Sequence, residues 1–184
     1  MWAIAIADDD PMVGHLPAGP VDLLLCLGDL ADTTIELAHA RYQPGRVYGV
    51  RGNHDPDAPF PGFVTDLHGR TDQYQGLTFG GFGGCWQYKP RGHHLHSQDE
   101  VSRIMLGFPR VDVFIAHNSS RGYHEFDDDV HQGFDAFLTY IELNQPRYFI
   151  HGHQHLARTT QIGATTLIGV YGEAGIELEG LEQA

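Results

Sequence analysis

Five short apolar runs in this chain of 184 residues each end directly in polar side chains that can bind a metal ion. Each run reads as a buried β-strand, because it is brief, apolar and bounded by charge or glycine. The runs occupy residues 2–7, 21–27, 47–50, 111–116 and 147–151. Ligands of open α/β sheets bind beyond the carboxyl ends of the strands. The sequence therefore predicts a fold that brings five polar segments together at one edge.

Segments with helical spacing alternate with these strands and indicate the fold class. Three helices are expected, over residues 33–41, 97–107 and 133–144. A further strand is expected at residues 77–82, and residues 157–179 read as two or three strands with glycine turns. Alternating strands and helices followed by strands alone predict an α/β layered fold with mixed sheets. The length fits a single domain over residues 1–184.

The ends and buried faces of two helices can also be predicted. Ser97 and Glu100 form a capping-box pattern at the start of the second helix. In the first helix, Thr33 or Thr34 is the expected N-cap. The apolar side chains expected to face inward there are Ile35, Leu37 and Ala38.

Charge and cysteine content exclude several classes of function. Lys and Arg number 11 against 24 Asp and Glu, and the net charge of −13 argues against nucleic acid or an anionic membrane as a partner. Two cysteines are too few for a disulfide scaffold or a thiolate zinc site. No apolar run approaches membrane-spanning length, and residues 1–7 lack the basic start of a signal peptide. We therefore expect a cytoplasmic protein.

The residues at the strand ends form one set of carboxylate, amide and imidazole donors. The segments are Asp8-Asp9-Asp10, Gly28-Asp29, Gly52-Asn53-His54-Asp55, His117-Asn118 and His151-Gly152-His153-Gln154-His155. Oxygen and nitrogen ligands without thiolate suit Mn, Fe, Mg or Zn. Six or seven ligands exceed one tetrahedral site and favour two metals that share a carboxylate. Glycine before a ligand permits a sharp turn into the site, although Gly-Asp and Gly-Asn pairs also mark ordinary turns.

The order and spacing of these segments resemble the calcineurin-like metallophosphoesterases over nearly the whole chain. The most specific pieces are Gly52-Asn53-His54-Asp55 and Gly152-His153-Gln154-His155. Residues 80–86 and 117–133 look like those of the small bacterial phosphodiesterase-type members. The resemblance implies a four-layer α-β-β-α sandwich with two metals on one edge.

The resemblance also implies a role for each residue of the set. It assigns Asp8, Asp29 and His155 to the first metal, and Asn53, His117 and His153 to the second, with Asp29 as the bridge. His54 would contact the phosphate and protonate the leaving oxygen as a general acid. Asp55 would orient His54, as carboxylates commonly hold a working imidazole.

One position departs from the pattern of the family. Asp10 stands where an Asp-x-His motif would place histidine. Asp is a competent ligand, so Asp10 is included in the predicted ligand set; the alternative is that Asp10, beside Pro11, only shapes its loop. A further hard, anionic ligand favours Mn or Fe, with Mg or Zn as the other candidates for the two divalent ions.

These roles predict hydrolysis of a phosphodiester bond in a small substrate, including the nucleotide type. The nucleophile would be a hydroxide that bridges the two metals. The motifs do not separate this activity from that of a phosphomonoesterase. The alternative from another class is a metal-binding sensor or scaffold with little turnover.

Three residues outside the motifs are candidates for substrate contact. Arg91 and His94 lie in a small basic segment of an acidic protein, where positive charge would help to hold an anion; the alternative is a solvated loop. His131 precedes an expected helix and either lines the pocket or only begins the helix. His124 precedes an acidic run and is expected to lie at a solvated rim.

Overall fold

Side chains of the first strand alternate between two buried layers. In the computed structural model, which describes residues 1–179, strand β1 (Trp2–Ala7) directs Ala5 into one apolar cluster and Ile4 and Ile6 into another. Successive side chains of a strand point to opposite faces, and here both faces are covered. Strand β9 (Val113–Ala116) divides its residues in the same way, with Ile115 in the first cluster and Phe114 in a third.

Two mixed sheets share the inner cluster. The first sheet has the order β13 (Gly172–Glu177), β1, β2 (Leu23–Cys26), β3 (Arg46–Gly49), β4 (Thr65–Asp66). The second has the order β11 (Arg158–Ile162), β12 (Thr165–Gly169), β10 (Tyr148–His151), β9, β6 (Leu77–Phe82), β5 (Thr71–Tyr74). Strands β13, β11 and β5 run antiparallel to their neighbours, and the other pairs are parallel. A short parallel pair, β7 (Cys85–Trp86) and β8 (Leu95–His96), stands apart.

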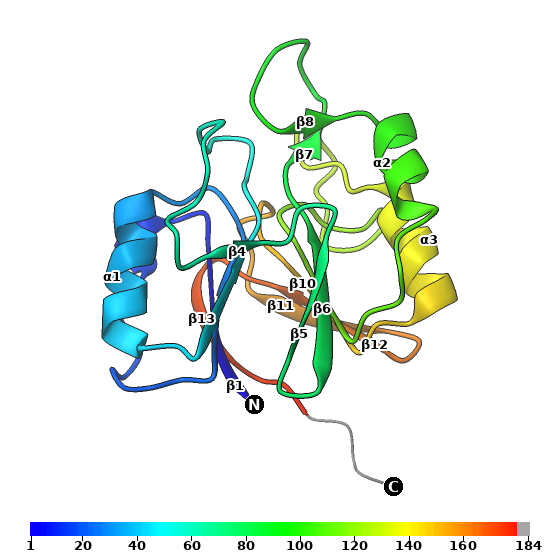
Figure 1. Ribbon diagram of the computed structural model, residues 1–184. Coiled ribbons are helices and arrows are strands. Elements are labelled where there is room, and N and C mark those ends of the chain that lie inside the picture. The colour runs from blue at the N-terminus through cyan, green and yellow to red at the C-terminus, as the bar shows by residue number, and fades with distance from the viewer. Residues whose placement is uncertain (180–184) are drawn as a thin grey trace, which may run out of the picture.

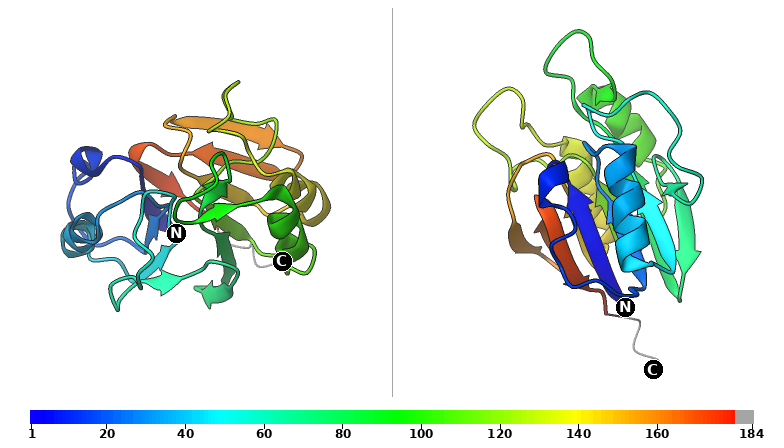
Figure 2. Two further views of the ribbon diagram at one scale, coloured as in Figure 1. Left: turned by 90° about the horizontal axis from the view of Figure 1, so that it is seen from above. Right: turned by 90° about the vertical axis from the view of Figure 1, so that its left-hand side faces the viewer.

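Helices cover the outer face of each sheet (Figures 1 and 2). Helix α1 (Asp32–Tyr42) packs Ile35 and Ala38 onto the first sheet. Helices α2 (Gln98–Met105) and α3 (Asp135–Asn144) pack onto the second sheet, where Phe137 of α3 meets Phe114. The four layers confirm the expected α-β-β-α sandwich with two mixed sheets. No helix in the described part of the chain has the length and apolar character needed to span a bilayer.

The helix ends confirm one capping prediction and correct another. The Ser97 hydroxyl accepts the N–H of Glu100 at 3.2 Å, as predicted, but the Glu100 carboxylate turns to His96 at 3.4 Å. The N-cap of α1 is Ala31, not Thr33 or Thr34, so the helix begins earlier than expected. Leu37 is 70% exposed, and the prediction that it faces the core is wrong, because one buried stripe formed by Ile35, Ala38 and Tyr42 suffices for α1.

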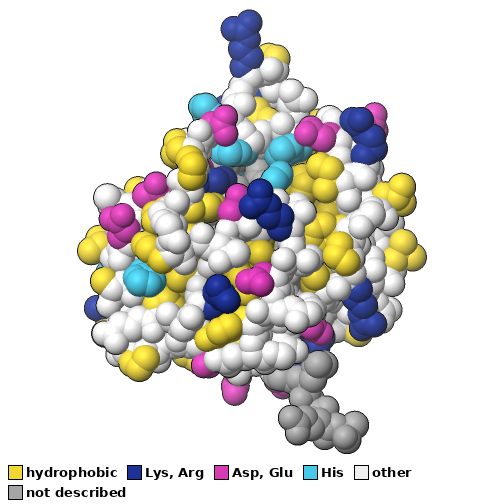
Figure 3. Space-filling view, viewed as in Figure 1, with side chains coloured by type: hydrophobic (Ala, Val, Ile, Leu, Met, Phe, Trp, Pro, Cys, Tyr) yellow, Lys and Arg dark blue, Asp and Glu magenta, His cyan; other side chains and the backbone are white. Residues whose placement is uncertain are grey.

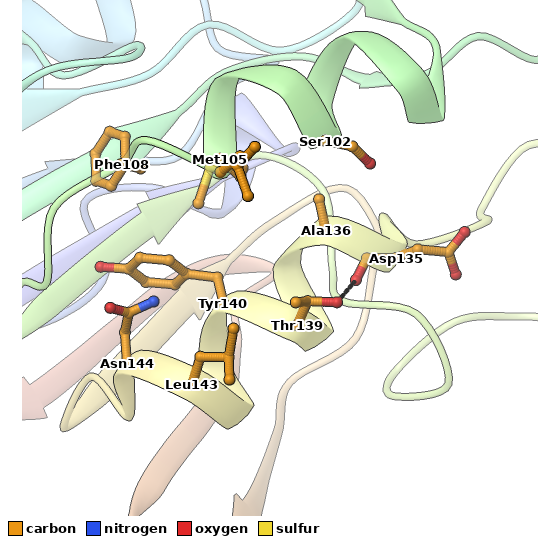
Figure 4. A pocket seen from close by; sticks show the side chains of 10 residues that line it. Ser102, Met105, Phe108, Asp135, Ala136, Thr139, Tyr140, Leu143 and Asn144 are labelled. Atoms are coloured by element: carbon orange, nitrogen blue, oxygen red, sulfur yellow. Dashed lines mark hydrogen bonds between the residues drawn. The ribbon is translucent and has the colours of Figure 1, made fainter.

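Between α2 and α3 the outer surface holds a groove of about 440 Å³ (Figure 4). Met105 of α2 and Tyr140 of α3 line it, together with the largely exposed Leu106 and Leu143. All of its lining residues belong to these two helices and the turn after α2, and none of them is a residue predicted for the metal site.

The parallel strands place their carboxyl ends at one edge, which is uppermost in Figure 1. In the first sheet Ile6, Cys26 and Gly49 are in register at the ends of β1, β2 and β3. In the second sheet Ala116 is in register with His151 at the ends of β9 and β10. The loops that follow all five strands therefore meet at this edge, as the sequence predicts.

Glu173 of β13 anchors the loop that follows β1. Its carboxylate accepts the N–H groups of Gly14, His15 and Leu16 at 2.9–3.0 Å and the hydroxyl of Tyr42. Burial opposes ionisation, but these hydrogen bonds outweigh it and lower the pKa of Glu173 below its ordinary value of 4.5. The folded protein therefore stabilises the ionised form of Glu173 relative to the unfolded chain.

We expect Glu173→Gln to lower the free energy of unfolding at pH 7 by about 1–3 kcal/mol, since bonds to a charged acceptor are lost. Because folding depresses this pKa, its stabilising effect is complete above pH 4.5 and is lost as the pH falls through the folded value. Urea unfolding would measure the free energy of unfolding of both proteins at pH 7 and at lower pH. The difference between wild type and variant should shrink as the pH falls. Glu177→Gln, at an exposed position of the same strand, is the control, and equal losses in both variants would contradict the assignment.

Candidate metal centre

Four of the predicted ligands have left-handed backbone conformations. The φ angles are 66° at Asp8, 55° at Asp29, 63° at His153 and 46° at His155. Residues other than glycine adopt this region rarely, although Asp and His are enriched in it, and such residues cluster at functional sites. The surrounding structure thus holds a sharp turn at each of these ligands, one to four residues beyond the end of its strand.

Two glycines allow the loops after β2 and β3 to approach each other. A Cβ atom on Gly28, whose φ is +95°, would lie 2.5 Å from the nitrogen of Gly52 and 2.6 Å from Nδ1 of His117. A Cβ atom on Gly52 would lie 2.6 Å from the backbone nitrogen of Asp29. Neither position has room for a side chain, so both glycines do more than mark a turn.

Asp8 links the end of β1 to the loop after β10. Its carboxylate is fully buried, and both oxygens accept the backbone N–H of His153, at 3.0 and 2.9 Å. Burial raises the pKa of Asp8 to about 7, with a smaller opposing effect from His117. A carboxylate in this position gains stability from any cation that binds beside it.

Asp29 and His117 form an ion pair at the centre of the edge. Oδ2 of Asp29 lies 3.4 Å from Nε2 of His117, and Oδ1 accepts the N–H of His54 at 2.8 Å. Burial opposes charge on both side chains, but each stabilises the charge of the other. The pKa of Asp29 is therefore lowered and the pKa of His117 is raised.

Two of the histidines have one ring nitrogen fixed by a main-chain carbonyl. Nδ1 of His117 donates to the carbonyl of Leu27 at 2.8 Å, and Nε2 of His153 faces the carbonyl of Val130 at 3.3 Å. A carbonyl can only accept, so in the neutral form of the ring, which is the form that binds a metal, the other nitrogen carries the lone pair. Metal-binding histidines are usually oriented in this way.

Distances between the donor atoms fit a cation. Nε2 of His117 lies 3.1 Å from Oδ1 of Asn53 and 3.4 Å from Oδ2 of Asp29. An ion with ligands at about 2.1 Å separates neighbouring ligand atoms by roughly 3.0–3.4 Å. Donor atoms of Asp29, His117 and His153 all lie within 4.8 Å of one another. Nδ2 of Asn53 is buried without a hydrogen-bond partner among the described residues, and the atom of this side chain that can bind a cation is Oδ1.

The remaining members of the predicted set lie nearer to solvent or bond to the main chain. His155 is exposed, and its ring stacks on Tyr171 at 5.1 Å between centroids. His54 is exposed beside Asp29. Oδ1 of Asp10, in the turn η1 (Asp10–Met12), accepts the N–H of Ala31 at 3.1 Å, which is a contact that shapes the loop. Its binding to a metal stays a prediction.

Asp55 makes hydrogen bonds to the main chain that the sequence did not indicate. We expected its carboxylate to orient the His54 ring, but the hydrogen bonds described for it go to the backbone N–H groups of Gly52, Asp29 and Leu30, at 2.7–3.0 Å. Burial raises the pKa of Asp55, and these bonds oppose that effect. The side chain thus joins the loop after β2 to the loop after β3.

Asn118 and Gln154, which directly follow two predicted ligands, were not given a role from the sequence. Nε2 of Gln154 donates to Ser119 at 2.9 Å and to the carbonyl of His131 at 3.0 Å. Nδ2 of Asn118 donates to the carbonyl of Gln132 at 2.9 Å. Their positions beside His117 and His153 were the only available signal, and they tie the loop over residues 130–132 to the site.

The three candidate substrate residues lie on two loops that rise from this end of the molecule (Figure 2, right). His131 contacts the predicted ligands, with its ring centroid 5.3 Å from that of His153. Nε2 of His94 lies 3.3 Å from the carbonyl of Pro56, in the loop that follows His54. Arg91 is exposed. Figure 3 shows histidine side chains gathered around a hollow in the upper part of the face it presents.

His124 corrects a prediction made from the acidic run beside it. It is 7% exposed and does not lie at a solvated rim. Its Nδ1 bonds to Nε2 of His151 at 3.0 Å, and its Nε2 bonds to the Thr160 hydroxyl at 2.8 Å. Burial lowers the pKa of His124 to about 4, so this buried pair is uncharged at neutral pH.

Comparison with known families agrees with this geometry. A family model described as the calcineurin-like phosphoesterase superfamily domain matches residues 5–183. The chain belongs to this superfamily. No curated protein sequence gives a significant match.

Solved structures share the fold of this calcineurin-like phosphoesterase at low sequence identity. TT1561 of Thermus thermophilus is 13% identical, with 93% of this chain and 89% of that chain covered and a TM-score of 0.62. The phosphopantetheinyl hydrolase PptH from Mycobacterium tuberculosis is 14% identical, with 92% and 89% covered and a TM-score of 0.59. Vps29 from Entamoeba histolytica, complexed with Zn²⁺, is 14% identical, with 94% and 74% covered and a TM-score of 0.50.

We expect Gly52→Ala to destabilise this phosphoesterase by about 1–3 kcal/mol, because the added methyl group would overlap the backbone of Asp29 and push the two loops apart. Thermal and urea unfolding would measure the effect. Gly62→Ala is the matched control, since a Cβ atom there meets nothing within 4 Å. If Gly52→Ala proved as stable as Gly62→Ala, the close approach of the loops would be refuted.

Proposed function

We propose that this protein is a metal-dependent phosphoester hydrolase that cleaves phosphodiester bonds of a small substrate, including the nucleotide type. The observation that carries the proposal is the group formed by Asp29, Asn53 and His117, whose donor atoms are spaced for a cation. Membership of the calcineurin-like superfamily supports ester hydrolysis as the reaction class.

The proposed centre holds two divalent ions, with Mn or Fe favoured over Mg or Zn. The proposed ligands are Asp8, Asp29 and His155 for one ion and Asn53, His117 and His153 for the other, with Asp29 shared. Asp29 suits the shared position because it lies between the loops after β1, β3 and β9 and stays ionised despite its burial. The hard oxygen donors and the absence of thiolate support the choice of ions.

Bound ions would neutralise charge on the phosphate and lower the pKa of the attacking water. The chain supplies the remaining steps. His54 is exposed at the edge while its backbone N–H is held by Asp29, so its ring can meet a substrate without leaving the site. We assign it the proton that the leaving alkoxide oxygen needs.

A diester is favoured over a monoester by the likeness of residues 80–86 and 117–133 to the phosphodiesterase-type members of the superfamily. Asp8, Asp29 and Asp55 place three carboxyl groups at one edge of a chain with a net charge of −13. Two bound divalent ions would outweigh the negative charge of these carboxyl groups, so charge alone does not separate the singly charged diester from the more highly charged monoester. The alternative enzymatic activity is that of a phosphomonoesterase. The alternative from another class is a metal-binding sensor or scaffold with little turnover.

We expect the purified protein to contain divalent metal by elemental analysis and to hydrolyse bis-p-nitrophenyl phosphate. Chelation should abolish this activity, and Mn²⁺ should restore it better than Zn²⁺. The rate on p-nitrophenyl phosphate should be lower. A higher rate on that monoester would replace the diester assignment, and bound metal without hydrolysis of any ester would support the sensor.

We expect His54→Ala to slow hydrolysis of diesters with alkoxide leaving groups by about 10²–10⁴-fold, the range typical of general acid catalysis. The loss on p-nitrophenyl esters should be less than about tenfold, since p-nitrophenolate leaves without a proton. Steady-state rates on a matched pair of alkyl and aryl diesters would measure the difference. His93→Ala, an exposed histidine outside the proposed machinery, is the control. Equal losses on both substrates would exclude the acid role.

A further inference from the structure

His131 and Asp128 form a side-chain pair beside the proposed metal centre. Nδ1 of His131 lies 2.8 and 3.0 Å from the two oxygens of Asp128. Oδ1 of Asp128 also accepts the backbone N–H groups of Val130 and His131, both at 2.8 Å. The Phe126 ring meets the His131 ring edge to face at 5.4 Å between centroids. The imidazole is therefore held in place although 26% of its side chain is exposed.

The main chain around His131 is fixed to the centre at three successive residues. The carbonyls of Val130, His131 and Gln132 meet the side chains of His153, Gln154 and Asn118 in turn, at 2.9–3.3 Å. Two of these three partners directly follow a proposed ligand and the third is itself one. The position of His131 relative to the centre is thus set by the centre itself.

The free nitrogen of His131 has the character of a metal ligand. A carboxylate can only accept, so Nδ1 of His131 carries the proton and Nε2 of the neutral ring carries the lone pair. Donation to a carboxylate or a carbonyl is the usual arrangement of a metal-binding histidine, and His117 and His153 show it with carbonyls. The three imidazoles therefore follow the same pattern around one site.

The distances from the His131 ring to two other histidine rings fit imidazoles bound to one metal ion. The His131 centroid lies 5.3 Å from that of His153 and 6.2 Å from that of His155. Metal–nitrogen distances of about 2.1 Å place the centroids of two imidazoles on one ion roughly 4.5–6.4 Å apart. Asp10 was included in the ligand set predicted from the sequence, but one of its carboxylate oxygens accepts the N–H of Ala31.

We propose that His131 is an additional ligand of the metal centre and that Asp128 orients it. The inference rests on the proposed function, because it adds a donor to the same centre. It assigns the loop between β9 and α3 a part in holding metal, in place of the substrate contact expected for His131 from the sequence.

Metal binding measured directly tests this proposal. Isothermal titration with Mn²⁺ and absorption spectra of the Co²⁺-loaded protein would be recorded for wild type, His131→Ala and Asp128→Asn. We expect His131→Ala to weaken one of the two ions by more than about 100-fold and to change the Co²⁺ d–d bands. Asp128→Asn should weaken the same ion by about 10–100-fold, the effect usual for the partner of a ligating histidine. Asp129→Asn, which removes the same charge from the same loop, is the control.

The outcomes separate this inference from the proposed function. Wild-type protein that binds neither ion would refute both. Two ions bound with unchanged affinity and spectra in His131→Ala would refute only the additional ligand; a raised KM in that variant would then return His131 to substrate contact. Circular dichroism and the unfolding midpoint establish that each variant is folded, and His131→Gln provides a second, more conservative variant.

Discussion

The buried carboxylates at the carboxyl edge of the sheets are the constraint on which the site depends. An uncompensated charge in a protein interior is costly, and several like charges close together cost more. The charge of Asp29 is stabilised by His117 and a backbone N–H, and that of Asp55 by three backbone N–H groups with a contribution from His117. Asp8 accepts the backbone N–H of His153 and has the His117 ring at 4.0 Å, but burial outweighs both and raises its pKa. The edge is therefore organised around negative charge that a cation would stabilise.

The layered fold makes this concentration of charge tolerable. Apolar side chains fill the space between the two sheets and beneath both sets of helices, and this packing holds the strand ends rigidly. Left-handed residues and close-packed glycines then turn the ligands inward within one to four residues of each strand. A small displacement of either sheet would separate donors that now lie within 3.4 Å.

The two halves of the molecule make different contributions to the edge. The first sheet supplies the carboxylates and the amide, from the loops after β1, β2 and β3. The second supplies the imidazoles proposed as ligands, from the loops after β9 and β10, whereas His54 comes from the first. The long loop between β9 and α3 adds Asp128 and His131, and the buried pair of His124 and His151 ties its beginning to β10. Loops on a rigid scaffold commonly carry function, and here one loop is attached at both ends to the residues it serves.

The sequence by itself determined the five strands that lead into the site, their burial and the types of donor that follow them; it did not indicate the short strands β4, β5, β7 and β8. These are local properties: a short apolar run followed by Gly-Asp or Gly-Asn indicates a strand and a turn wherever the rest of the chain lies. Which face of α1 is buried was harder to predict. Leu37 has the spacing of a buried helix position, but only the packing of α1 against the sheet decides whether that side chain is covered.

Only the tertiary structure decided what each polar atom contacts. The carboxylate of Asp8 meets a residue 145 positions away, and Leu27 fixes the ring of a histidine 90 positions away. Asp55, Asp10 and His124 each bond to partners that their neighbours in the sequence did not indicate. A side chain has several possible hydrogen-bond partners, and the choice among them is made by the elements that the fold packs beside it.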